Sequence, residues 1–149
     1  MTRRSRRNGA LDIALVRQLQ LRKAIADAAQ ARAALDLERD RQRQVDAEHD
    51  AHLAAWRGVA TADRLSPALL ANCAAALVSV SAQRDAALRR VDARTAELAV
   101  VRDVLQQRDR LAEAADRQAF HVEKQHRAAL DERRMTELEI RVALSGGNR

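Results

Sequence analysis

Ser66 and Pro67 begin the longest stretch of this chain that nothing interrupts. A serine hydroxyl followed by proline is typical of a helix start, because proline at the first helical position loses no hydrogen bond. No further proline follows, and no glycine occurs before Gly146. The sequence therefore predicts one helix over residues 67–144, and a helix of that length needs a partner along its apolar side.

A heptad repeat of apolar residues marks that side. Counted in one register, the a and d positions from Leu70 to Ala143 give 22 sites, of which 16 are apolar. This period is typical of a coiled-coil seam, as the a and d positions are called below. Composition agrees: 33 alanines favour long helices, while one Trp, one Phe and no Tyr disfavour a globular core.

The partner helix is predicted over residues 10–57, where a weaker heptad pattern ends at Gly58, a C-terminal stop signal. Residues 58–66 are the interior turn, and a turn that short places its two helices antiparallel. We therefore expect an all-α fold, an antiparallel coiled-coil hairpin of two long helices. A flexible basic arm is expected at 1–9, and a disordered tail at 145–149.

The register of the hairpin is predicted from two charged residues on the seam, Glu38 and Arg84. Facing residues of an antiparallel pair have numbers with a constant sum, and a sum of 122 sets these two side chains opposite each other. A buried polar pair of this kind costs stability but fixes the register. In that register Ala10 meets Ala112, so residues 113–144 form a C-terminal helical overhang without a partner in the chain.

This overhang keeps an apolar stripe, which indicates a binding surface. The stripe includes Ala115, Ala119, Val122, Ala129 and Ile140, with Phe120 and Leu130 nearby. The chain has no glycine-rich phosphate loop, no HExxH, no CxxC and no irregular segment for building a pocket. The sequence thus favours an interaction protein over an enzyme, with no cofactor, no bound metal and no small-molecule ligand.

The turn end of the hairpin holds the remaining unusual side chains. His49, His52 and Cys73 are of types that bind zinc, but their spacing is a weak signal, and polar seam residues are the simpler interpretation. Trp56 is expected to pack against the start of the second helix. A lone tryptophan at a turn is also a suitable anchor for a partner protein.

The net charge is +6, and Arg3, Arg4, Arg6 and Arg7 precede the first predicted helix. Such an arm can bind nucleic acid or anionic lipid, although a solvated tail is the simpler interpretation. The single cysteine forms no internal disulfide, and no apolar run approaches the length of a membrane span. We expect a cytoplasmic protein, peripheral to a membrane at most.

The last third of the chain contains Glu123-Lys124-Gln125 and then Leu130-Asp131-Glu132. These motifs, on two long antiparallel helices, resemble the central stalk proteins of type III secretion, flagellar FliJ and the injectisome YscO/SctO proteins. The resemblance implies a stalk whose open end inserts into the hexameric secretion ATPase and whose turn end points to the export gate protein. Secretion chaperones are further candidate partners.

Two sets of residues follow from that resemblance. The set implied for the ATPase is Phe120, Val122, Glu123, Gln125, Ala129, Leu130, Asp131, Glu132 and Ile140. The set implied for the export gate is His49, His52, Trp56, Leu70 and Cys73.

Two other classes of function stay open. One is a dimerising coiled-coil spacer or adaptor, in which two copies pair their overhangs. The other is a basic nucleic-acid-associated coiled coil using the N-terminal arginines. Nucleic acid is the less favoured partner, because the near absence of aromatic residues disfavours base stacking.

Overall fold

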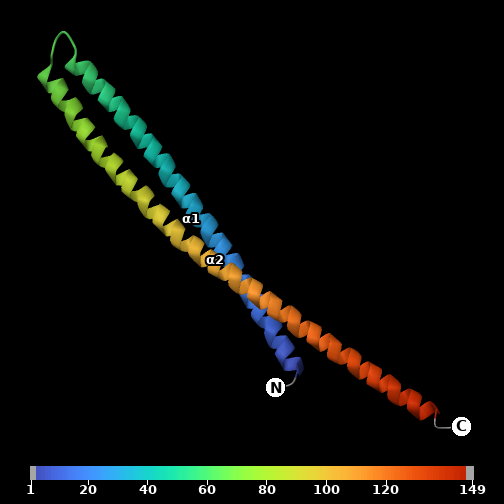
Figure 1. Cartoon of the computed structure of the whole chain (residues 1–149). Helices are drawn as coiled ribbons and strands as arrows, with labels where there is room; N and C mark the ends of the chain where they lie inside the picture. Colours follow the sequence, from blue (N-terminus) through green and yellow to red (C-terminus); the bar gives the residue numbers. More distant parts are fainter. Residues whose placement is uncertain (1–2, 147–149) are drawn as a thin grey trace. The chain divides into compact units, whose positions relative to one another are not determined.

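The computed structural model describes residues 3–146, and this part of the chain consists of two helices and a short loop (Figure 1). Helix α1 covers Arg3–Ala60, with 58 residues, and helix α2 covers Pro67–Gly146, with 80 residues. The prediction of an all-α chain with two long helices is confirmed. Neither helix has, within the described residues, an apolar stretch long enough to cross a membrane.

Helix α2 begins where the sequence predicts. The Leu69 N–H donates to the Ser66 hydroxyl at 3.4 Å, and the Leu70 N–H donates to the Ser66 carbonyl at 3.0 Å. Ser66 is therefore the N-cap, and Pro67 needs no hydrogen-bond acceptor at the first helical position.

Helix α1 is longer than predicted at both ends. Gly58 does not stop it, because no glycine of the described chain has a positive φ, and the helix continues to Ala60. Thr61 closes the end instead: its N–H and its hydroxyl both donate to the Arg57 carbonyl, at 3.1 and 2.9 Å. The turn is thus confined to residues 61–66.

The predicted flexible arm at 1–9 is wrong for residues 3–9, which are helical. Arginine is a good helix former, and the single Gly9 lowers helix stability by only about 1 kcal/mol, which the packing of neighbouring residues can offset. The predicted tail is likewise shorter, since α2 includes Ser145 and Gly146. Residues 1–2 and 147–149 of the predicted arm and tail lie outside the described chain.

The structure divides into two compact units. Unit 1 comprises Met1–Ile25 and Val104–Arg149, and unit 2 comprises Ala26–Asp103. Each unit contains a segment of α1 and a segment of α2, and each is described by itself below.

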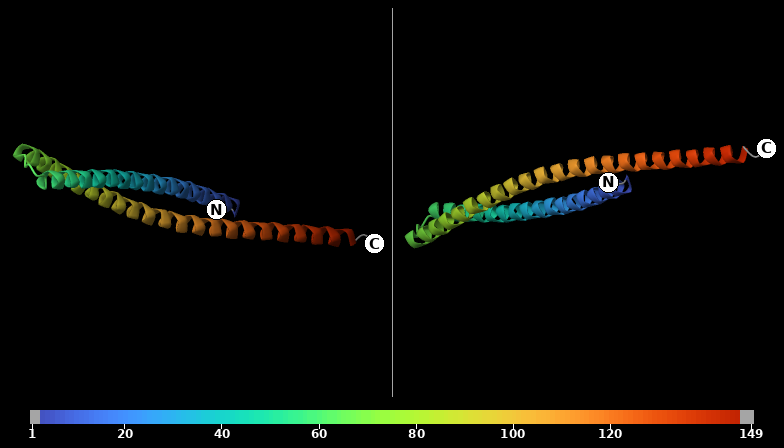
Figure 2. Two further views of the ribbon diagram at one scale, coloured as in Figure 1. Left: turned by 90° about the horizontal axis from the view of Figure 1, so that it is seen from above. Right: turned by 90° about the horizontal axis from the view of Figure 1, so that it is seen from below.

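In unit 2 the two helical segments lie side by side and meet at the loop (Figure 2). Arg84 of α2 pairs with Asp46 of α1, with 2.7 Å between Nε and Oδ1, and Arg90 pairs with Glu38, with 3.4 Å between Nε and Oε2. Residue numbers fall along one segment while they rise along the other, so these segments are antiparallel. The buried apolar residues of unit 2 are Leu35, Val80, Ala87 and Leu98.

The predicted pairing of Glu38 with Arg84 is wrong. Each residue has another partner across the seam, and the paired numbers sum to 130 for Arg84 with Asp46 and to 128 for Arg90 with Glu38. The register is therefore about one heptad away from the sum of 122. The physical reason is the continuation of α1 past Gly58, which moves the turn to higher residue numbers.

In unit 1 the start of α1 packs against residues 112–129 of α2. Ala14, Ala115 and Ala119 form a buried cluster. Arg7 and Glu123 form an ion pair at 2.8 Å, and the Gln18 side-chain amide donates to Asp116 at 2.6 Å. From the first of these pairs to the second, the residue number rises in α1 and falls in α2, so the two segments are antiparallel in this unit too.

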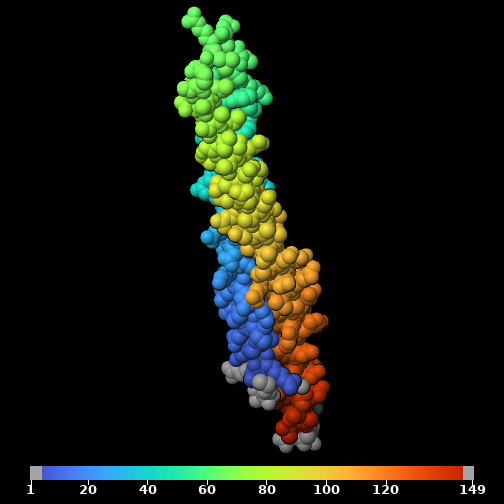
Figure 3. Space-filling model, turned by 90° about the vertical axis from the view of Figure 1, so that its left-hand side faces the viewer, coloured from blue at the N-terminus to red at the C-terminus, as the bar shows by residue number. Residues whose placement is uncertain are grey.

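The predicted overhang therefore begins too early. Ala115 and Ala119, expected to lack a partner, are buried against α1. The earlier start of α1 and the one-heptad change of register extend the packed part of α2 as far as Ala129. Residues 130–145 are all exposed, and they are called the free end below. In Figure 3 this part of α2 continues beyond the first residues of α1.

Candidate functional site

The free end of α2 carries a dense set of exposed apolar side chains. Val142 is 70% exposed and Leu144 is 75% exposed. Transfer of such aliphatic surface out of water would be favourable, so a partner that covers these side chains would gain binding free energy. The full set of large apolar residues exposed there is Leu130, Met135, Leu138, Ile140, Val142 and Leu144. Five of these fall within residues 135–144, so the free end is a candidate interaction surface.

These side chains lie on two sides of the helix. Ile140 and Leu144 are four residues apart and continue the direction of the seam, whereas Met135, Leu138 and Val142 are spaced to share the opposite side. A helix that is apolar on opposite sides is typically surrounded by other protein, because a single flat partner would cover one side only. The geometry of the free end therefore favours a partner that encloses it.

A shallow cavity lies where α1 begins, next to the free end. It has a volume of about 450 Å³. Its lining residues are Arg6, Val122, Gln125, His126, Ala128, Ala129 and Glu132. Three of them, Val122, His126 and Ala129, are seam positions of α2 that follow the buried cluster of Ala14, Ala115 and Ala119. The seam therefore continues as a depression, which is large enough to hold a side chain of a partner.

The structure divides the residues predicted for ATPase binding. Phe120, Gln125, Leu130, Asp131, Glu132 and Ile140 are exposed. Val122, Glu123 and Ala129 are partly buried in unit 1. The Glu123 carboxylate is engaged on both oxygens, by the ion pair with Arg7 at 2.8 Å and by a hydrogen bond from Arg127 at 3.2 Å. Glu123 therefore contributes to the packing of unit 1. The six exposed residues of the predicted set are the ones accessible to a partner.

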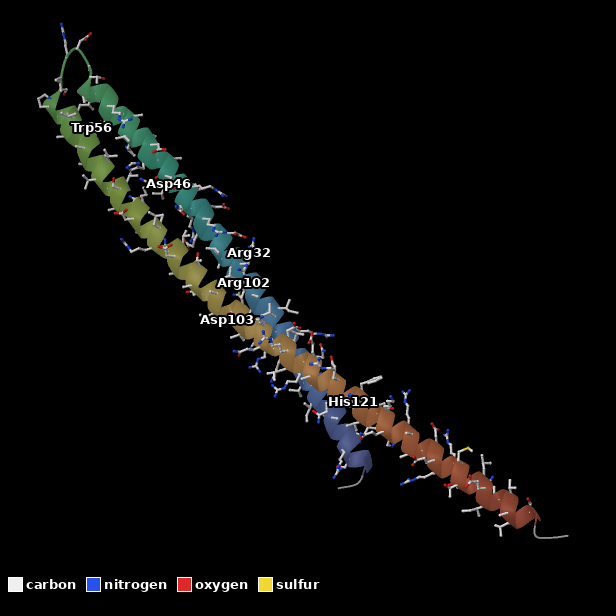
Figure 4. All side chains as sticks on the ribbon, in the orientation of Figure 1. Arg32, Asp46, Trp56, Arg102, Asp103 and His121 are labelled. Atoms are coloured by element: carbon white, nitrogen blue, oxygen red, sulfur yellow. The ribbon has the colours of Figure 1, made fainter. Side chains whose placement is uncertain are left out.

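Phe120 stands apart from the seam. It is 69% exposed, and its ring meets the His121 ring edge to face, with centroids 6.3 Å apart. His121 is labelled in Figure 4. An aromatic ring this exposed is a suitable anchor for a partner, although it lies on the packed part of α2 rather than on the free end.

The residues predicted for the export gate all lie in unit 2, and all are partly buried: His49, His52, Trp56, Leu70 and Cys73. Trp56 lies near the loop (Figure 4). These side chains occupy seam positions, so they pack between the segments and do not form an exposed patch. Among the described residues, no three of the His, Cys, Asp and Glu side chains gather as a metal site would need.

The exposed apolar residues at the loop are ones that sequence reasoning missed. Leu65 is 61% exposed and Leu69 is 50% exposed. Both flank the N-cap Ser66, where the seam has not yet begun. The signal was available in the sequence, because neither leucine falls on an a or d position of the heptad pattern.

One charged cluster in unit 2 is structural. Among the described residues, Glu38 is the one charged side chain that is buried, at 7% exposure. Arg41 donates a hydrogen bond to it at 2.7 Å from its own helix, and Arg90 approaches from α2. The pKa of Arg94 is raised mainly by its hydrogen bond to Glu97 and by the charge of Glu97, with a smaller contribution from Glu38.

The free end and the loop leucines are thus exposed apolar surfaces at which a partner would bind. Comparisons with protein-family models, with curated proteins and with solved structures found no match.

Proposed function

We propose that this chain is a non-enzymatic stalk of a type III secretion apparatus, flagellar or injectisome. In this proposal the two helices form an antiparallel coiled-coil hairpin. Its free end, residues 130–145, binds inside the hexameric secretion ATPase, and its loop end contacts the export gate protein at the cytoplasmic face of the apparatus. Secretion chaperones remain further candidate partners.

The observation that carries the proposal is the free end of α2, apolar on opposite sides and exposed over its whole length. A ring that surrounds a helix covers both sides at once, which is what this distribution of leucine, isoleucine, valine and methionine requires. The resemblance of Leu130-Asp131-Glu132 to the stalk family supports the secretion ATPase as the partner of this same segment.

A dimerising spacer is the second candidate, and the size of the free end disfavours it. Sixteen residues span about 24 Å of helix. Two such segments bury less than the roughly 1,200–2,000 Å² of a stable protein interface. Self-association through the free end would therefore be weak, and sedimentation at micromolar concentration distinguishes a monomer from a concentration-dependent dimer.

The test is a truncation after Ala129, which removes the free end and leaves the packed residues of unit 1 in place. We expect the melting midpoint to stay within a few degrees, because residues 130–145, the removed part whose burial the structure describes, are all exposed. Binding to the secretion ATPase and stimulation of ATP hydrolysis should both disappear.

Point variants refine this test. Leu138→Glu and Val142→Glu place charges on the free end, and Val100→Glu places one at a similarly exposed site in unit 2 as the matched control. We expect the first two to weaken ATPase binding at least tenfold and the control to leave it unchanged. Full binding and stimulation by the truncated chain would overturn the proposal.

A further inference from the structure

The first part of α1, residues 3–25 in unit 1, carries the excess charge of the whole chain. Residues 1–25 include seven basic residues and one acidic residue, Asp12, which gives +6. The remaining 124 residues contain 20 basic and 20 acidic side chains, so they are neutral. The net positive charge of the chain therefore comes from the residues at one end of one helix.

The same segment exposes apolar side chains. Leu11, Ile13, Leu15, Val16 and Leu19 are between 42 and 61% exposed. Leu11, Leu15 and Leu19 are spaced four residues apart and form a stripe on one side of the helix, away from the buried Ala10 and Ala14. Five large apolar residues within nine positions exceed the scattered exposure that a soluble surface normally shows.

Two of the basic side chains here flank the leucine stripe and are available to a partner. Arg22 and Lys23 are exposed and form no ion pair among the described residues, whereas Arg6 lies on the opposite side of the helix and lines the cavity beside α2. Arg7 differs, because it is held by Glu123. The α2 segment of unit 1 does not neutralise the charge, since residues 104–149 contain nine basic and eight acidic side chains.

We propose that this surface, formed by Leu11, Leu15, Leu19, Arg22 and Lys23, docks α1 flat on an anionic phospholipid bilayer. The leucines enter the boundary between headgroups and acyl chains, and the basic side chains bind the lipid phosphates. Charge complementarity selects an anionic surface. The leucines select lipid over nucleic acid, because a phosphate backbone would leave them in water.

This inference is independent of the proposed function. It uses α1 rather than the free end of α2, and its test needs vesicles and no secretion ATPase. Failure of one proposal therefore leaves the other standing.

The test is flotation of the full chain with vesicles. One set is phosphatidylcholine alone, and the other is a two-to-one mixture of phosphatidylcholine and phosphatidylglycerol. We expect the chain to float with the anionic vesicles only, and binding should weaken as salt is raised, because salt screens the attraction between the basic side chains and the lipid.

The charge variant combines Arg22→Glu and Lys23→Glu. Its matched control combines Arg117→Glu and Lys124→Glu, exposed positions of α2 in the same unit that change the net charge equally. Each basic residue at an anionic surface contributes about fivefold in partitioning, so we expect a loss of at least about 25-fold for the α1 variant. The control should lose much less.

The apolar variant combines Leu11→Gln, Leu15→Gln and Leu19→Gln, and its control combines Val100→Gln, Val104→Gln and Leu111→Gln, all at exposed sites. Circular dichroism checks that every variant stays helical. We expect the α1 variant alone to lose vesicle binding.

Three results would overturn the proposal. The first is absence of wild-type binding to the anionic vesicles at physiological ionic strength. The second is an equal loss in the α1 variants and their controls, which would indicate non-specific attraction. The third is binding to duplex DNA as tight as binding to vesicles and unchanged by the leucine substitutions, which would identify a nucleic-acid surface instead.

Discussion

Glu38 is the residue at which charge and packing conflict most directly. It is buried on the seam of unit 2, while its partners Arg41 and Arg90 are both about half exposed. A buried ion pair gives up the hydration of its charges, and apolar residues of similar size often replace such a pair without loss of stability. The arginines can return to water when the carboxylate is removed.

We therefore expect Glu38→Leu to leave the free energy of unfolding unchanged or to raise it by about 1 kcal/mol, as measured by urea denaturation. Glu48→Leu, at an exposed position of α1, is the control and should have little effect. A loss of more than about 2 kcal/mol in Glu38→Leu would instead show that the ion pairs of Glu38 stabilise unit 2.

At the scale of the elements, the ends of the helices decide the arrangement. Gly58 and Gly9 are both inside α1, and a methyl group added at either position meets no atom within 4 Å. Neither has a positive φ. Glycine in such a place only increases the conformational entropy of the unfolded chain.

Gly58→Ala should accordingly stabilise the chain by about 0.5–1 kcal/mol, and Gly9→Ala by a similar or smaller amount near the helix end. Thermal unfolding followed by circular dichroism measures both. Destabilisation by Gly58→Ala would mean that the helix ends at this glycine in a left-handed conformation, as the sequence first indicated.

The packed part of α2 in unit 1 gives another prediction. Truncation after Arg110 removes Ala112, Ala115 and Ala119, all buried. We expect residues 3–25 to lose much of their helicity and the melting midpoint to fall well below that of the chain truncated after Ala129. Equal midpoints for the two truncations would contradict the packing in unit 1.

At the scale of the whole molecule, the heptad pattern predicted the helical class and the buried positions. In the first predicted helix the a positions recur every seven residues from Leu21 to Trp56, and the d positions from Ala24 to His52. Each of these residues is at least partly buried. The register could not be read with the same certainty, because shifting a heptad repeat by seven residues again places apolar residues opposite apolar residues. Glu38 has an arginine on the facing helix in either register, Arg84 in one and Arg90 in the other.

The start of α1 and the candidate surfaces were harder to predict, for a different reason. An arginine-rich terminus has the composition of a solvated tail, and only the burial of Ala10 and the ion pair of Arg7 with Glu123 distinguish it from one. The first residues of α1 are therefore held by tertiary contacts, which local sequence does not reveal. The apolar free end was predicted in kind, but its start moved from 113 to 130 with the register.

The alanines of the seam have a mechanical consequence. Among the described residues, the buried apolar side chains of unit 1 are all alanine: Ala10, Ala14, Ala24, Ala112, Ala115 and Ala119. Alanine methyl groups present a smooth, shallow surface, so they resist sliding of one helix along the other much less than interlocking leucines do. A displacement of one heptad corresponds to about 10 Å along the axis. Resistance to shear in unit 1 therefore comes chiefly from its cross-helix polar contacts, Arg7 with Glu123 and Gln18 with Asp116.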